Sequence, residues 1–330
     1  MRTDGPSAPP SSLGPGPTAA LVEILAHVRG RLAAGNDAIA IDVADPDLGA
    51  GQHAGTRLSG PYEGWVHRPW RVWVDLATRL ALRLATPRPG PAPGLVRLTL
   101  HRLAADEPAE AGRERYGQAS SFARVHKAED PSFVLDLSDA LDRAGLGDRP
   151  RILDLGVGDG AEIALLHALR PAWRDAEVVG VDHSPSAIAR ARQRLADRPV
   201  RLVEADVADL PTLDPDPGRF DLVVSIATMH GPGVDDRALL RHLVQTRVTE
   251  RGALIFGFPN CRYRDGELLY GARMRNFGQP ELSLLVKDVA FYRRYLQQHR
   301  RKVYVTGQHY VLVTAVPLDA PNAPGTAGRW

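Results

Sequence analysis

The stretch RILDLGVGDG, residues 151–160, decides the fold class. It begins with a short, mostly apolar run that is typical of a buried strand, and it ends with three closely spaced glycines, Gly156, Gly158 and Gly160. The apolar spacing of residues 161–170 predicts a helix directly after them. Glycines at such a turn let a ligand approach the backbone, and the helix start offers N–H groups without intrahelical partners. The turn is therefore a candidate binding site, although a purely structural strand–helix turn has the same composition.

Outward from this turn, short strands and helices alternate over residues 115–317. The strands are continuous β-branched runs, which indicates a mostly parallel sheet with helices on both faces. Residues 301–307 and 309–317 are two further strands around a tight, glycine-containing turn and should form an antiparallel hairpin. We therefore expect an α/β, doubly wound, mostly parallel seven-stranded sheet with a terminal antiparallel hairpin. The other predicted strands are 151–157, 176–184, 200–208, 220–228 and 252–258, and the predicted helices are 130–145, 161–170, 185–197, 235–248 and 281–300.

A small N-terminal α/β extension precedes this domain. Residues 1–17 are rich in Pro, Gly and Ser and should be disordered. Residues 18–105 form the extension, in which helical spacing at 18–34 and 70–85 alternates with strand patterns at 37–45 and 95–103. We place the main domain at 106–317 and a flexible tail at 318–330.

The composition limits the classes of partner. The 330 residues carry 41 Lys+Arg against 39 Asp+Glu, a formal net charge of +2, so charge provides no general attraction to nucleic acid or to an anionic membrane. The single cysteine, Cys261, cannot form an internal disulfide, and no Cys/His cluster has the spacing of a zinc site. No segment has the apolar length of a membrane span or a signal peptide. These features predict a soluble, cytoplasmic protein without a metal site.

Acidic residues near the turn distinguish between candidate ligands. Asp182 ends the next predicted strand, where a carboxylate can accept hydrogen bonds from both hydroxyls of a ribose. Asp154 precedes the first glycine and Asp159 lies within the turn, so a pyrophosphate would meet negative charge there. This argues against the dinucleotide of a nicotinamide-dependent oxidoreductase. A phosphate-free cation that contains ribose, such as S-adenosylmethionine, fits these charges better.

The motifs and their order resemble those of the class I S-adenosylmethionine-dependent methyltransferases. DLGVGDG at 154–160 is similar to the family's acidic-x-Gly-x-Gly-x-Gly motif, and VVGVDHS at 178–184 is similar to its second motif. EADVADLP at 204–211, FDLVVSIATMHG at 220–231 and RGALIFGF at 251–258 resemble the segments that follow. The resemblance implies a Rossmann-like methyltransferase fold with S-adenosylmethionine as its cofactor.

This resemblance also implies roles for residues at the strand ends. The three glycines would form the floor beneath the methionine part of the cofactor, and Asp154 would hold the ammonium side through water or backbone. Asp182 would bind the ribose, Asp206 the adenine amino group, and the backbone amide of Val207 the adenine ring. Ser225 would touch the cofactor, although a strand-end serine bonded to the backbone is the structural alternative.

Methyl transfer is an in-line displacement at carbon, so the protein mainly supplies alignment. A base is needed only where the acceptor must lose a proton. His230 follows the fourth strand at the carboxyl edge of the sheet and is the candidate catalytic base. The alternative is a histidine that packs beside the cofactor or caps the next helix.

The insert at residues 259–280 is longer than the usual connection in a compact domain. It interleaves Arg262, Arg264, Arg273 and Arg275 with aromatic residues. One interpretation is recognition of an anionic acceptor, and the other is a solvated basic lid or a dimer contact.

Together these patterns predict S-adenosylmethionine-dependent methyl transfer to a small acceptor that the sequence does not identify, an anionic acceptor being one interpretation of the insert. Three alternatives stay open: an RNA methyltransferase, which should carry a strongly basic face, a nicotinamide-dependent oxidoreductase, and a non-catalytic S-adenosylmethionine-binding protein. The balanced charge argues against nucleic acid as a partner, nothing indicates a membrane, and a homodimer is left open.

Overall fold

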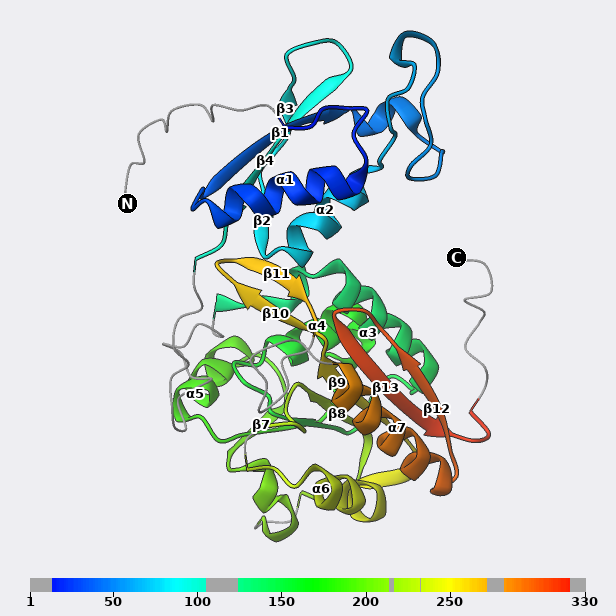
Figure 1. The fold of residues 1–330 in the computed structure, drawn as a ribbon. Coiled ribbons are helices and arrows are strands. Elements are labelled where there is room, and N and C mark those ends of the chain that lie inside the picture. The colour runs from blue at the N-terminus through cyan, green and yellow to red at the C-terminus, as the bar shows by residue number, and fades with distance from the viewer. Residues whose placement is uncertain (1–13, 105–123, 214–216, 232, 272–281, 321–330) are drawn as a thin grey trace. The chain divides into compact units, whose positions relative to one another are not determined.

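The computed structural model contains a seven-stranded sheet in the order β12-β13-β9-β8-β5-β6-β7 (Figure 1). Strand β5 pairs in parallel with β6 and β8, β6 with β7, and β8 with β9, whereas β13 is antiparallel to β9 and β12. This confirms the doubly wound, mostly parallel sheet and its terminal antiparallel hairpin. The strands are β5 (Ile152–Leu155), β6 (Val178–Asp182), β7 (Val200–Glu204), β8 (Phe220–Ile226), β9 (Val248–Pro259), β12 (Arg301–Thr306) and β13 (Tyr310–Pro317).

Helices pack against both faces of this sheet. Along β13, Val313 belongs to the core that also includes Leu296 of the last helix, whereas the ring of Tyr310 lies 5.0 Å from that of Phe133. Successive side chains of a strand point to opposite faces, so α7 and α3 cover opposite faces of the sheet. The helices are α3 (Pro131–Ala144), α4 (Ala161–Leu169), α5 (Pro185–Arg194), α6 (Asp236–His242) and α7 (Leu282–Gln298).

The structure describes residues 14–104, 124–213, 217–231, 233–271 and 282–320. The chain divides into two compact units, Met1–Asp106 with Tyr263–Tyr270, and Glu107–Arg262 with Gly271–Trp330. The seven-stranded sheet belongs to the second unit. Residues 1–13 of the N-terminal segment that we expect to be disordered lie outside the described residues, and so do residues 321–330 of the expected flexible tail. Within residues 14–17, the carbonyl of Pro17 accepts a hydrogen bond from the amide of Val66. None of the helices in the described ranges is long and apolar enough to cross a membrane.

The first unit contains a four-stranded sheet where the sequence pattern predicted two strands. Its strands follow the order β1-β4-β2, with β3 paired to β4, and Ile24, Val28 and Trp73 are buried in its core. A separate hairpin, β10 (Cys261–Arg264) and β11 (Glu267–Tyr270), forms part of the insert. The other elements are α1 (Leu21–Ala33), β1 (Ala38–Ala44), α2 (Trp70–Arg79), β2 (Leu82–Leu84), β3 (Arg88–Pro89) and β4 (Leu95–Arg102).

Two predicted helices end earlier than their apolar spacing suggests. Helix α2 stops at Arg79, Ala81 takes a φ of 54°, and Leu82–Leu84 pair with β4 instead. Pairing to an existing strand here outweighs helical propensity, because it buries Leu82 and satisfies the backbone. Likewise, α6 ends at His242, and a π-helical turn over Leu243–Arg247 leads into β9.

Candidate functional site

The glycine turn lies between β5 and α4, at the carboxyl edge of the parallel strands. The amides of Gly156 and Val157 donate to the carbonyl of Val181 at 2.8 and 3.1 Å, which fixes the turn to β6. Gly156 has a φ of 80°, and a Cβ there would lie 1.9 Å from the hydroxyl oxygen of Thr228. A side chain is therefore excluded, and the turn packs closely against the segment after β8.

Asp182 and the glycine turn meet directly. The amide of Gly158 donates to one carboxylate oxygen of Asp182 at 2.9 Å, and the amide of Ser184 donates to the other at 2.9 Å. A carboxylate has about four acceptor positions, so Asp182 retains capacity for further donors such as ribose hydroxyls. Two motifs that are separate in the sequence thus form one continuous surface.

Asp206 and Val207 follow β7 at the same edge. The amide of Ala205 donates to the carbonyl of Asp182 at 2.9 Å, which joins the ends of β6 and β7. The carboxylate of Asp206 is exposed and accepts one hydrogen bond, from the amide of Ala208 at 2.9 Å. Val207 is 6% exposed. The structure therefore places both residues beside Asp182, as a shared adenosine site requires.

Asp154, at the end of β5 before the glycine turn, is a buried acid. It is fully buried, and neither of its carboxylate oxygens has a hydrogen-bond partner among the residues that the structure describes. Burial raises the pKa of Asp154 well above its usual value, and the nearby Glu162 carboxylate raises it further, while the Lys127 ammonium acts in the opposite direction. A buried carboxyl group without a partner is costly, so this orphaned group suits a cationic ligand.

The buried Glu162 and the partly exposed Lys127 complete this cluster, and sequence reasoning missed both. Glu162 lies in the first turn of α4 and forms an ion pair with Lys127, which comes from the short helical turn before α3. Burial raises the pKa of Glu162, and Lys127 opposes that rise. The sequence around Lys127 does not show this pairing, because Glu162 lies on a different element 35 residues away.

Asp159 has a different role from the one its position in the turn suggests. Its carboxylate pairs with Arg194 at 2.6 Å and lies 3.7 Å from Arg190, both on α5, and it also accepts from the amide of Ala161. Its charge is thereby compensated within the protein. The negative character of the site depends on Asp154, Glu162 and Asp182 instead.

Ser225 is fully buried, and its hydroxyl donates to the carbonyl of Leu155 at 3.3 Å. This bond joins β8 to the end of β5. The geometry matches the structural alternative for Ser225 more closely than contact with a cofactor.

His230 lies just beyond β8, as the motif suggests. Its Nε2 is 3.5 Å from a carboxylate oxygen of Asp288 on α7, and its ring lies 4.7 Å from that of Phe258. The side chain is 24% exposed. An imidazole near a carboxylate is suited to proton transfer, and one whose ring lies against Phe258 is equally suited to packing.

A second histidine–carboxylate pair was not found from the sequence. The Nδ1 of His309 lies 3.1 Å from a carboxylate oxygen of Asp130, and the amide of Asn260 donates to the carbonyl of His309 at 2.7 Å. His309 precedes β13, whose first residue pairs with the last residue of β9, so it too lies at the carboxyl edge. In the sequence, the feature that could have identified His309 is its position in the predicted turn between the two terminal strands.

The basic insert is only partly described. Arg264 belongs to the first unit, where its guanidinium donates to the carbonyl of Ala104 at 2.6 Å, and Arg262 belongs to the second. Arg273 and Arg275 lie outside the described residues. Cys261 is buried, and burial raises the pKa of its thiol to about 12, so it is not an activated nucleophile.

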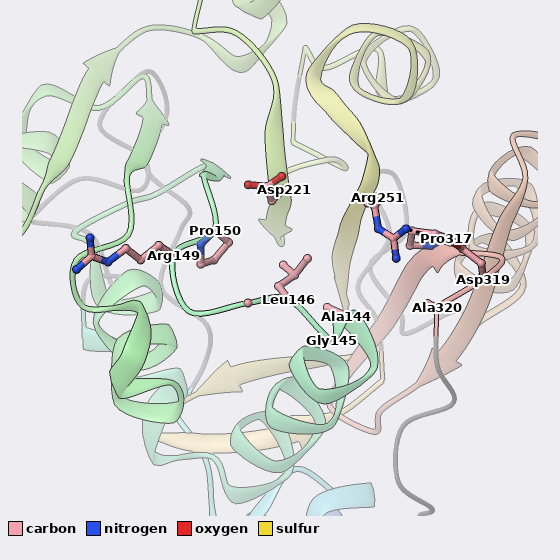
Figure 2. Close-up of a pocket in the computed structure, with 11 residues that line it drawn as sticks. Ala144, Gly145, Leu146, Arg149, Pro150, Asp221, Arg251, Pro317, Asp319 and Ala320 are labelled. Atoms are coloured by element: carbon pink, nitrogen blue, oxygen red, sulfur yellow. Dashed lines mark ion pairs between the residues drawn. The ribbon is translucent and has the colours of Figure 1, made fainter.

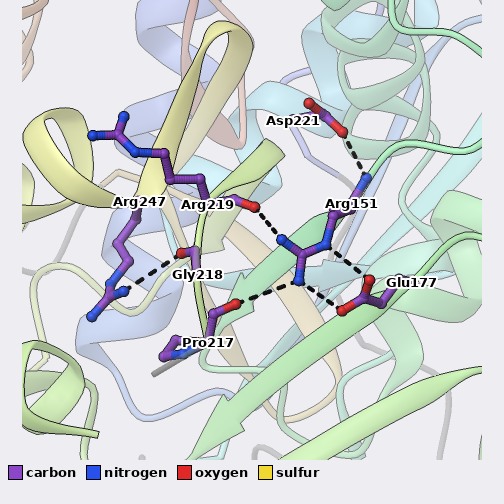
Figure 3. A network of polar contacts seen from close by, with 7 residues as sticks. All are labelled: Arg151, Glu177, Pro217, Gly218, Arg219, Asp221 and Arg247. Atoms are coloured by element: carbon purple, nitrogen blue, oxygen red, sulfur yellow. Dashed lines mark hydrogen bonds and ion pairs between the residues drawn. The ribbon is translucent and has the colours of Figure 1, made fainter. Parts of the chain in front are cut away.

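The opposite, amino edge of the sheet holds structural polar contacts (Figure 3). The guanidinium of Arg151 makes two 2.8 Å hydrogen bonds with Glu177 and one of 2.6 Å with the carbonyl of Arg219. A hollow of about 280 Å³ lies at this edge, lined by residues such as Arg149, Asp221 and Arg251 (Figure 2). The Asp221 carboxylate already accepts from the amide of Arg151 and the hydroxyl of Thr249. Among the described residues that line this hollow, none has a buried side-chain polar atom without a partner, in contrast to Asp154 at the carboxyl edge.

Comparison with known proteins agrees with the geometry of the carboxyl edge. Residues 152–248 match the family described as a methyltransferase domain. The chain is 32% identical to a malonyl-[acyl-carrier protein] O-methyltransferase of Anoxybacillus flavithermus, over 32% of this chain and 37% of the relative. It is 28% identical to a trans-aconitate 2-methyltransferase of Enterobacter sp., over 55% of this chain and 62% of the relative. A release factor glutamine methyltransferase of Mycobacterium leprae is 36% identical over 35% of this chain and 38% of the relative.

Each of these matches spans less than two thirds of the relative's length. A solved S-adenosylmethionine-dependent methyltransferase of Aquifex aeolicus aligns with a TM-score of 0.41 at 18% identity, over 58% of this chain and 96% of that chain. No group of metal-ligating side chains suited to hold an ion occurs in the described part of the chain. The glycine turn, the acids at the strand ends and the matched family agree: the chain carries a methyltransferase domain of the class I S-adenosylmethionine-dependent family.

Proposed function

We propose that this chain binds S-adenosylmethionine at the carboxyl edge of β5 to β8 and transfers the methyl group to a small, carboxylate-bearing acceptor. The observation that carries this proposal is the junction of the glycine turn with Asp182, through the hydrogen bond from the Gly158 amide, above the unpartnered carboxyl group of Asp154. A glycine cradle, a ribose-binding acid and a buried negative group match the three parts of the cofactor.

Each part of the site has a specific task in this proposal. Gly156, Gly158 and Gly160 provide the floor below the methionine part, and the free acceptor positions of Asp182 take the ribose hydroxyls. Asp206 binds the adenine amino group, and the amide of Val207 contacts the ring. Bound S-adenosylmethionine supplies an activated methyl group, and the protein contributes alignment and exclusion of water.

The acceptor class is inferred from the names of the relatives and from the histidine side chains at this edge. Malonyl and aconitate groups, named in two of the relatives, are carboxylic acids. His309 lies at the carboxyl edge, where its Nδ1 is 3.1 Å from a carboxylate oxygen of Asp130, and His230 lies just beyond β8. An ionised carboxylate attacks without losing a proton, so His230 and His309 would orient such an acceptor. An acceptor with a hydroxyl or amide group would need one of them as a base.

A protein acceptor is the second candidate, because the M. leprae relative is named for methylation of a release factor glutamine. The two classes are separable by assay. Formation of S-adenosylhomocysteine with trans-aconitate or a malonyl thioester supports the small acid, and formation only with a purified release factor supports the protein.

Calorimetric titration with S-adenosylhomocysteine tests the cofactor assignment. We expect one site, and we expect Asp182→Asn to weaken binding about tenfold or more, since hydrogen bonds to a charged group each contribute about 1.5–3 kcal/mol. Asp319→Asn is the matched control, because Asp319 is exposed at the amino edge. Binding of a nicotinamide dinucleotide in place of S-adenosylhomocysteine would refute the proposal.

A further inference from the structure

Two buried carboxyl groups under the glycine turn share one nearby cation. Asp154 and Glu162 are 0% and 7% exposed, and Lys127 forms an ion pair with Glu162. Both oxygens of Asp154 and the Oε2 of Glu162 lack hydrogen-bond partners among the described residues. We call Asp154 and Glu162 the acid pair. A single ammonium group cannot compensate two carboxylates in a medium of low polarity.

The other charged groups around the acid pair leave this imbalance in place. Asp182, on β6, adds a third negative group that acts on both acids. Asp159 faces Glu162, but its charge is compensated by Arg194 on α5. Burial is the main cause that raises the pKa of both members of the acid pair, Lys127 opposes the rise for both, and the Asp182 carboxylate adds to it for both. The ligand-free site therefore favours the protonated form of these two carboxyl groups more strongly than solvent favours it for an exposed acid.

We propose that the acid pair detects the ammonium group of the bound cofactor by exchanging a proton for it, and that Lys127 is the positioning residue that sets the pH at which this exchange occurs. This inference rests on the proposed function, since it assumes that the methionine part lies over the glycine turn. Arrival of the ammonium group supplies the missing positive charge. The O–H bond of one carboxylic acid then breaks, its proton passes to solvent, and the ligand itself keeps all of its atoms.

The exchange makes binding depend on pH in a defined direction. Where one proton is released, affinity rises about tenfold for each pH unit between the pKa of the bound acid pair and that of the free acid pair. A ligand with the nucleoside but without the ammonium group should bind with no such dependence. S-adenosylhomocysteine and 5′-methylthioadenosine form this matched pair of probes.

Removing an acid from the cluster and removing Lys127 should have opposite effects on how many protons the ligand-free site holds at neutral pH. Asp154→Asn leaves Glu162 with its partner Lys127 as one acid for one cation, so the remaining carboxylate is ionised and the proton release disappears. Lys127→Met removes the cation, so the acid pair retains its proton to higher pH and affinity at neutral pH falls, with recovery as the pH rises. Lys127→Arg should restore the wild-type pH profile. A purely structural Lys127 would instead lower the affinity equally at all pH values.

The experiment is calorimetry from pH 6 to 8.5 in phosphate and in Tris, two buffers with different heats of ionisation. We expect S-adenosylhomocysteine to release up to about one proton per molecule bound and 5′-methylthioadenosine to release none. Lys302→Met, at the other edge of the sheet, serves as the lysine control. Binding of S-adenosylhomocysteine with no buffer dependence overturns this inference alone, whereas no binding at all overturns the proposed function with it.

Stability of the ligand-free protein provides a second measurement. An acid whose pKa is raised by folding favours the folded state at low pH, and that contribution is lost as the pH rises through the folded-state pKa. Asp154→Asn lacks this loss. Between the unfolded-state and the folded-state pKa of Asp154, the ratio of its folding equilibrium constant to that of the wild type should therefore rise about tenfold per pH unit. Glu162→Gln should show the same trend, and parallel stability profiles for the variants and the wild type would contradict the inference.

Discussion

Gly156 shows how a single position controls the site. Its φ of 80° disfavours any L side chain, and a Cβ would approach the Thr228 hydroxyl oxygen to 1.9 Å. Gly158 also has a positive φ, of 53°, but the nearest atom to a Cβ there is 4.0 Å away. A side chain at Gly158 would therefore meet backbone strain only, whereas a side chain at Gly156 would meet both backbone strain and a steric clash.

We therefore expect Gly156→Ala to lose S-adenosylhomocysteine binding by about a hundredfold or more, because both backbone strain and the clash oppose the turn. Gly158→Ala should weaken the binding free energy by about 1–2 kcal/mol, because only backbone strain opposes the turn in that variant. Combining Gly156→Ala with Thr228→Ala removes the clashing hydroxyl and should recover part of the loss. Calorimetry on the folded variants measures this, and equal losses for the two glycines would contradict the steric explanation.

The residues of the site that were predictable are those whose signal is local. The glycine turn and Asp182 each occupy a fixed place relative to a strand end, so the pattern of strands and helices identifies them. Lys127 and Glu162 are 35 residues apart, and His309 and Asp130 are 179 apart. Such pairings depend on which elements become neighbours in the sheet, and periodicity does not specify that.

Among the elements, the central parallel strands β5, β6 and β8 were predictable because they are buried on both faces and read as continuous apolar runs, whereas the edge strand β7 is only partly buried. The errors occur where pairing overrides propensity. Residues 82–84 continue the helical pattern of α2 and yet pair with β4, and the end of the helix at 235–248 changes to a π-helical turn before β9. Both corrections lie at the end of a helix that leads directly into a strand.

Arg151 joins three strands at the amino edge of the sheet (Figure 3). It precedes β5 and bonds to Glu177 next to β6 and to the carbonyl of Arg219 next to β8. We expect Arg151→Met to lower the free energy of unfolding by about 1–2 kcal/mol, because carbonyl and carboxylate acceptors lose their donor. Affinity for S-adenosylhomocysteine should stay within about twofold of wild type, since no bond of Arg151 reaches the carboxyl edge.

Denaturant titration and calorimetry on the same variant check this prediction. Arg149→Met is the control, because Arg149 is an exposed arginine two positions earlier and lines the hollow in Figure 2. Loss of ligand affinity in Arg151→Met without loss of stability would show that the amino edge takes part in binding.

Within the second unit, the two edges of the sheet divide the tasks of stability and binding. At the amino edge, the guanidinium of Arg151 is paired with the carboxylate of Glu177 and the carbonyl of Arg219. At the carboxyl edge, the Asp154 carboxyl group is buried without a partner and Asp182 keeps free acceptor positions. A parallel sheet favours this division, because its turns into the following helices all lie at one edge and present helix N-termini there.

Hydrogen exchange across the chain tests this division. S-adenosylhomocysteine should slow exchange in peptides that cover residues 154–162, 180–185 and 203–209, because the amide of Gly158 and its neighbours become shielded from solvent. Peptides covering 147–152 and 217–222, at the amino edge, should exchange at unchanged rates and serve as the internal reference. In Asp182→Asn at the same ligand concentration, the slowing should decrease in all three protected segments together, since Asp182 joins the glycine turn to the ends of β6 and β7. Slowing spread evenly over both edges would instead indicate a general stabilisation of the fold, and the carboxyl edge would then have no special place in binding.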